Sequence, residues 1–134
     1  MRREFALSRA GLGAAFHFIT ETVAREGRDE LVAQRLSIIV DEIFGNLVEH
    51  DGSLTDAHRF TLELRDDGAG TVLVICDPGR PFDPLGHREQ PATEFGGYGL
   101  DLVRELCSSV SYERAEGCNR LTVSILPEGE PQPQ

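Results

Sequence analysis

The sequence of 134 residues contains no tryptophan, a single methionine, three cysteines and few basic side chains. No run of apolar residues approaches the roughly 18 that a helix needs to cross a bilayer, so we expect no membrane contact. Cys76, Cys107 and Cys118 are widely separated, which favours neither a disulfide framework nor a zinc site. Buried thiols in a reducing compartment are the simplest interpretation, and we expect a soluble cytoplasmic protein.

Acidic residues outnumber basic residues by 23 to 13, and the formal net charge is -10. Proteins that bind the phosphate backbone of nucleic acids present a basic surface, so we expect no direct contact with DNA or RNA. A nucleotide site is not excluded, because only the charge close to a bound phosphate matters there. The acidity is also compatible with a partner protein that has a basic surface.

The length fits one domain, and neither an internal repeat nor a linker divides the sequence. The last eight residues, PEGEPQPQ, are rich in proline and polar side chains, a composition typical of disordered segments. We therefore predict one domain over residues 1–126 and a disordered tail over residues 127–134.

Two stretches of apolar residues at helical spacing precede the first long strand pattern. Gly27 can end the first helix, and Asp29 suits the N-cap of a second helix that runs to about His50. Strands are predicted near residues 5–7, at 60–64, at 71–76 and as a final pair around Gly117, with a helix over about 98–108. Paired hairpins favour a mainly antiparallel sheet covered by helices, an α+β two-layer sandwich.

Two polar residues, Glu42 and Asn46, are four positions apart on the second predicted helix, at the margin of its apolar stripe. Asp41 falls roughly half a turn from the centre of that stripe, so it should point to solvent. Side chains at the edge of a buried face can line a cleft, although a solvated helix edge gives the same pattern. The pair becomes informative only beside the segments that follow.

Two segments containing glycine follow this helix in the sequence. Asp77-Pro78-Gly79 comes directly after the central strand, where a glycine allows close approach of a ligand to the backbone. FGGYGL at residues 95–100 opens a helix, and a helix N-terminus favours an anion. Each has an ordinary alternative, since these residue types are common in turns and the second segment lacks the lysine of a P-loop.

The order and spacing of the three segments resemble the GHKL ATPase superfamily, which includes gyrase, heat-shock chaperones and histidine kinases. The resemblance covers about residues 5–126 and implies an ATP-binding domain. Glu42 and Asn46 are similar to its N-box, and Asp77 and Gly79 to its first glycine box. Its second glycine box corresponds to Gly96, Gly97, Tyr98, Gly99 and Leu100, and its late strand, with a threonine behind the adenine, to residues 117–123 with Thr122.

Within the superfamily the sequence is most similar to the anti-sigma factor serine kinases. The N-box that ends in Glu49-His50 and the DPGRPFDP run at 77–84 are typical of that group. Many relatives carry a basic residue where Tyr98 stands, which leaves the phosphates less neutralised here. The segment between 84 and 96 corresponds to a lid over the nucleotide. Basic residues that could contact the phosphates instead are Arg80, His87 and Arg88.

The resemblance also implies the roles of individual residues toward ATP and Mg²⁺. Asp77 would accept a hydrogen bond from the adenine amino group, supported through water by Thr122, while Gly79 leaves room for the base. Asn46 would ligate Mg²⁺, which tolerates one protein oxygen among waters and phosphate oxygens. Backbone N–H groups of residues 97–100 would hold the phosphates.

Glu42 would then act as general base on a serine or threonine of a STAS-type anti-sigma-factor antagonist. Three alternatives stay open: a non-catalytic module that binds nucleotide and sequesters a sigma factor or another regulator, an ATPase domain serving a histidine-kinase system in trans, and an inert structural relative. Retention of Glu42 and Asn46 favours catalysis over binding alone. The relatives are dimeric, so the resemblance is compatible with a homodimer, although the sequence itself leaves the oligomeric state open.

Overall fold

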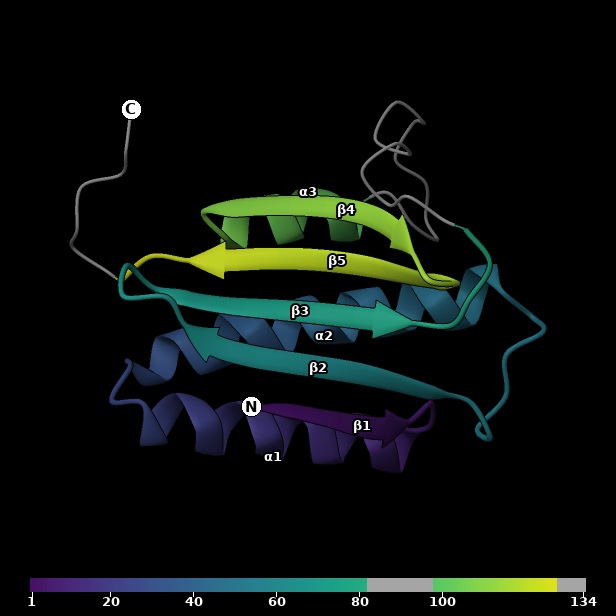
Figure 1. The fold of residues 1–134 in the computed structure, drawn as a ribbon, viewed down its shortest axis with the longest axis horizontal. Coiled ribbons are helices and arrows are strands. Elements are labelled where there is room, and N and C mark those ends of the chain that lie inside the picture. The colour runs from purple at the N-terminus through teal and green to yellow at the C-terminus, as the bar shows by residue number, and fades with distance from the viewer. Residues whose placement is uncertain (82–97, 128–134) are drawn as a thin grey trace.

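The computed structural model describes residues 1–81 and 98–127, with the backbone alone described at His50 and at residues 98–100. Five strands form one antiparallel sheet in the order β1-β2-β3-β5-β4. Helices α1, α2 and α3 cover one face of this sheet (Figure 1), which confirms the predicted α+β two-layer sandwich. The elements are β1 (Arg2–Ala6), α1 (Arg9–Arg25), α2 (Glu30–His50), β2 (Arg59–Asp66), β3 (Thr71–Asp77), α3 (Tyr98–Leu106), β4 (Ser109–Ala115) and β5 (Cys118–Ile125).

The helix α2 forms because its sequence carries both an N-terminal cap and a continuous apolar stripe. The carboxylate of Asp29, the N-cap residue, accepts the backbone N–H of Leu31 at 2.9 Å. Val32, Leu36 and Ile39 lie on the stripe and are buried. The stripe continues toward the C-terminal half of α2, where it reaches the pocket described below.

The hydrophobic core lies between the sheet and the helices. Leu121, Val123 and Ile125 of β5 are buried in it, while the residues between them are only half-buried. Side chains alternate between the two faces of a strand, so these three residues point toward the helices and their neighbours point away. This alternation decides which polar residues of β5 can reach the helix-covered face of the sheet.

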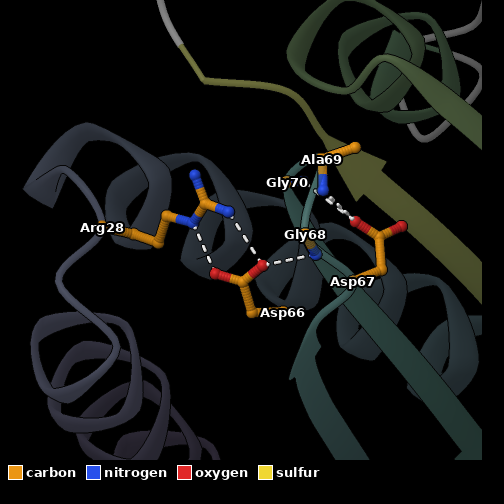
Figure 2. Close-up of polar contacts among 6 residues, drawn as sticks. All are labelled: Arg28, Asp66, Asp67, Gly68, Ala69 and Gly70. Carbon is orange, nitrogen blue, oxygen red and sulfur yellow. Dashed lines mark hydrogen bonds and ion pairs between the residues drawn. The ribbon is translucent and has the colours of Figure 1, made fainter.

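A bidentate ion pair joins the junction between α1 and α2 to the turn between β2 and β3 (Figure 2). Nε and Nη2 of Arg28 donate to the two carboxylate oxygens of Asp66 at 2.7 and 2.8 Å. Asp66 also accepts the N–H of Gly68, which has a φ of 89° that favours glycine. The hydrogen bond from Arg28 is the main reason that the pKa of Asp66 is lowered.

Several predicted boundaries agree with the structure to within a few residues. The second predicted helix has its N-cap at Asp29 and ends at His50, whereas the predicted helix over 98–108 ends at Leu106. Residues 128–134 of the predicted tail lie outside the described residues. No helix in the described part of the chain is long and apolar enough to span a bilayer. The three cysteines are half-buried free thiols.

Candidate functional site

A pocket opens where the C-terminal half of α2 faces β3, β4 and β5. Its empty volume is about 510 Å³, part of which is open to solvent. A mainly apolar wall with a few polar groups is typical of small-molecule sites. The lining residues are Ile43, Asn46, Leu47 and Asp51 from α2 and its C-cap, Ile75, Asp77 and Arg80 from β3 and the turn after it, and Tyr112, Asn119 and Leu121 from β4 and β5.

Asp77, the last residue of β3, is buried and lines the pocket. Its Oδ1 accepts the N–H of Gly79 at 2.9 Å and the Nδ2 of Asn119 at 3.0 Å. Both of these hydrogen bonds are accepted by Oδ1. Burial raises the pKa of Asp77, and the hydrogen bonds from Asn119 and Gly79 oppose this only in part. Asp77 therefore presents a carboxylate at the pocket wall, which could accept a hydrogen bond from a donor on a ligand.

Gly79 is closely packed, and its backbone conformation does not itself require glycine. A Cβ at this position would lie 2.9 Å from Leu47 Cδ1 and 3.0 Å from Asp77 Oδ1. A larger residue would therefore displace the ends of the Leu47 and Asp77 side chains. Gly79, which the sequence analysis selected together with Asp77, therefore packs closely against Leu47 of α2.

Asn119 is buried on β5 and joins two other strands and the turn after β3. Its Nδ2 donates to Asp77 Oδ1 at 3.0 Å and to the carbonyl of Arg80 at 2.9 Å. Its Oδ1 accepts the Tyr112 hydroxyl at 2.6 Å and Nη1 of Arg114 at 3.2 Å. None of Asn119, Tyr112 and Arg114 was singled out from the sequence, because their proximity to Asp77 depends on the register of three strands.

Asp51, the C-cap residue of α2, is a second buried carboxylate of the pocket that the sequence analysis did not select. Its Oδ1 accepts the N–H and the hydroxyl of Ser53, and its Oδ2 accepts the N–H of Arg80 at 2.9 Å. Hydrogen bonds from the Ser53 hydroxyl and the Arg80 N–H lower the pKa of Asp51 to about 2. Asp51 thereby connects the end of α2 to the turn after β3.

The polar residues predicted on α2 have distinct positions in the structure. Asn46 is half-buried and lines the pocket. Glu42, one turn earlier, is also half-buried but is not among the lining residues. Asp41 is exposed, as its place opposite the apolar stripe led us to expect.

Thr122 does not lie beside Asp77. Because Leu121 and Val123 point toward the helices, Thr122 lies on the opposite face of the sheet. The residue that pairs with Asp77 in the β3–β5 register is Asn119, which donates to it directly. The expectation that Thr122 supports Asp77 is therefore corrected, and Asn119 occupies that position.

The second glycine segment is described only in part. Gly96 and Gly97 lie outside the described residues, as do His87, Arg88 and the segment expected to form a lid. The structure begins again at α3, whose first three residues are Tyr98, Gly99 and Leu100. Arg80 is among the residues that line the pocket.

The donor set of the pocket fits a magnesium ion that is held mainly by a ligand. Asn46 offers one amide oxygen, and Mg²⁺ commonly keeps waters and binds phosphate oxygens beside one or two protein ligands. Across residues 1–81 and 98–127, no group of three or more His, Cys, Asp and Glu side chains could hold a metal ion. These residues therefore do not fit a structural metal site.

Comparison with known proteins is consistent with this geometry. The family model described as a histidine kinase-like ATPase domain matches residues 5–125. The serine/threonine-protein kinase BtrW of Bordetella bronchiseptica is 28% identical, and the match covers 82% of either chain. The crystal structure of the RsbU and RsbW domains of Rv1364c from Mycobacterium tuberculosis shares the fold, with a TM-score of 0.63 at 17% identity. That match covers 95% of this chain and 32% of the other, so this chain spans about a third of that protein.

Proposed function

The chain belongs to the histidine kinase-like ATPase domain family, and we propose that it binds ATP in the pocket between α2 and the sheet and transfers the γ-phosphate to a serine or threonine of a partner protein. The observation that carries the ATP site is Asp77, a buried carboxylate in the pocket wall that Gly79 and Asn119 hold through one of its oxygens. Similarity to BtrW, a serine/threonine-protein kinase, supports the transfer step.

Base recognition follows from the chemistry of the pocket wall. The carboxylate of Asp77 would accept a hydrogen bond from the adenine amino group. Guanine presents a carbonyl oxygen at the same position, which an ionised carboxylate repels because it can only accept. The flat faces of the base would contact apolar side chains of the lining, namely Ile43, Leu47, Ile75 and Leu121.

The phosphates would be bound at the other end of the site. Asn46 would ligate Mg²⁺, and backbone N–H groups from Gly97 to Leu100 would hold phosphate oxygens, because a helix N-terminus stabilises an anion. When bound, the ion neutralises negative charge on the phosphates. Glu42 precedes Asn46 by one turn on α2 and would take the proton from the attacking hydroxyl.

The proposed substrate is a STAS-type anti-sigma-factor antagonist, in the manner of the kinase group that the sequence resembles. The same proposal includes a sigma factor as a second partner. It also includes assembly as a homodimer and a cytoplasmic location. Retention of Glu42 beside Asn46 favours phosphate transfer over simple sequestration of a regulator.

A test uses Mg-ATP labelled at the γ-phosphate, candidate antagonist proteins and three variants on α2. Glu42→Gln should lower the transfer rate by about 10²–10⁴-fold and leave nucleotide affinity nearly unchanged, because a general base acts mainly in the transition state. Asn46→Ala should weaken both. Asp41→Asn, an exposed neighbour that loses the same charge as Glu42→Gln, should behave as the parent.

Two outcomes would contradict parts of the proposal. Transfer at the parental rate by Glu42→Gln would remove the general base. If the parent binds ATP and holds a sigma factor but phosphorylates no antagonist, the protein is a nucleotide-binding regulator rather than a kinase.

A further inference from the structure

The turn after β3 is held by side chains from three other elements. Nη1 of Arg114 on β4 donates to the carbonyl of Gly79 at 2.7 Å. Asn119 on β5 donates to the carbonyl of Arg80 at 2.9 Å, and Asp51 at the end of α2 accepts the N–H of Arg80 at 2.9 Å. The backbone that follows Asp77 is therefore fixed through both donors and acceptors.

The Asn119 amide has its orientation fixed by the donors around it. The Tyr112 hydroxyl and Arg114 Nη1 both point at one end of the amide, at 2.6 and 3.2 Å. Arginine has no acceptor, so that end must be the oxygen. The amide nitrogen must then face Asp77, to which it donates at 3.0 Å. Arg114 thus keeps the donating end of the Asn119 amide toward Asp77, where it binds Oδ1 beside the N–H of Gly79.

We infer that Arg114 is a positioning residue for base selection: by fixing the Asn119 amide and the Gly79 carbonyl, it holds Asp77 in the orientation that distinguishes adenine from guanine. The inference rests on the proposed ATP site and assigns a role to a residue that does not line the pocket itself.

The charge of Arg114 acts in the same direction as its hydrogen bonds. Burial raises the pKa of Asp77, and the nearby guanidinium of Arg114 is one of the groups that lower it. A protonated Asp77 could donate to the carbonyl oxygen of guanine, whereas the ionised form can only accept. Removal of Arg114 would therefore both release the Asn119 amide and weaken the preference for the ionised carboxylate.

The experiment compares the dissociation constants of Mg-ATP and Mg-GTP by titration calorimetry for the parent and three variants. Arg114→Gln removes the guanidinium, and Tyr112→Phe removes only the hydroxyl donor to Asn119. Arg65→Gln is the matched control, because it removes the same charge from an exposed arginine of β2 that is paired with Glu63. A thermal melt without nucleotide establishes that each variant is folded.

Arg114→Gln should lower the preference for ATP over GTP by about tenfold, mainly through weaker ATP binding, because a charge-assisted hydrogen bond that positions the acceptor is lost. Tyr112→Phe should also lower the preference for ATP over GTP, by a smaller factor. Arg65→Gln should keep the parental ratio of the two dissociation constants. If Arg114→Gln does not fold, Tyr112→Phe decides the question.

A parental ratio in both Arg114→Gln and Tyr112→Phe overturns the inference and leaves the ATP site intact. Equal weakening of ATP and GTP also overturns it, because a general loss of charge or stability would act on both nucleotides. Failure of the parent to bind either nucleotide removes the ATP site and this inference together.

Discussion

Asp77 is in an environment that is unfavourable for its charge and favourable for its proposed role. Burial raises its pKa, so the ionised form is disfavoured in the folded protein. The effect of Asp77 on folding is therefore most favourable below its ordinary pKa of 3.8, and this advantage is lost as the pH rises through the raised value. The protein thus keeps an acidic group at a buried position that disfavours its charged form, which is expected of a residue retained to bind a ligand.

Asp77→Asn separates stability from recognition. Asn119 and Gly79 both donate to the position of Oδ1, so they should hold the new amide with its oxygen inward and its nitrogen toward the ligand. We expect unchanged or higher stability at neutral pH, ATP affinity lower by about tenfold, and a preference shifted toward GTP. Thermal melts and calorimetry measure these effects, with Asp41→Asn as the exposed control. Parental ATP affinity would mean that Asp77 is only a turn residue.

Asp51 has the opposite dependence on pH. Hydrogen bonds from Ser53 and Arg80 lower its pKa from 3.8 to about 2, so its stabilisation is complete above 3.8 and is lost as the pH falls through about 2. Urea unfolding should show that Asp51→Asn is less stable than the parent at neutral pH and that the difference shrinks in this acid range. Asp56 is an exposed residue near Asp51, and the difference in stability between Asp56→Asn and the parent should not change over this pH range. If the difference in stability between the parent and Asp51→Asn stays constant as the pH falls through about 2, the role of Asp51 is contradicted.

At the scale of elements, the sequence predicts features that depend on local patterns better than features that depend on contacts between strands. The cap at Asp29 and the apolar stripe of α2 are local, and the structure confirms the helix they predict. The alternation of Leu121, Val123 and Ile125 is also local, and it places Thr122 on the face of the sheet away from the helices. The proximity of Arg114 to Gly79 has no local signal, because it depends on the β4–β5 register and on the path of the chain after β3.

The ion pair between Arg28 and Asp66 should stabilise the packing of helices on the sheet. Its side chains are 21% and 29% exposed, whereas those of Arg65 and Glu63 are 54% and 39% exposed. Water and salt screen the second pair more strongly. Asp66→Asn should therefore lower the melting temperature more than Glu63→Gln, and the difference should persist at high salt. If the two substitutions lower the melting temperature equally, the ion pair between Arg28 and Asp66 does not stabilise the packing of the helices on the sheet.

At the scale of the whole molecule, the pocket is built from both layers of the sandwich. Its lining comes from α2 in the helical layer and from β3, β4 and β5 in the sheet. A ligand there contacts both layers at once, so its binding energy should oppose global unfolding rather than only a local opening. The net charge of -10 does not prevent this, because groups close to the phosphates determine their binding.

The most direct test of the central claim is the shift in thermal melting of the full chain on addition of Mg-ATP, measured beside Asp77→Asn and Asn46→Ala. At an ATP concentration 100 times its dissociation constant, the parent should gain about 2.7 kcal/mol of stability, and it should gain less from GTP at the same concentration. Asn46→Ala should reduce the gain for both nucleotides, and Asp77→Asn should reduce it for ATP in particular. An unchanged melting temperature of the parent at millimolar Mg-ATP, with no heat of binding in calorimetry, would contradict the account.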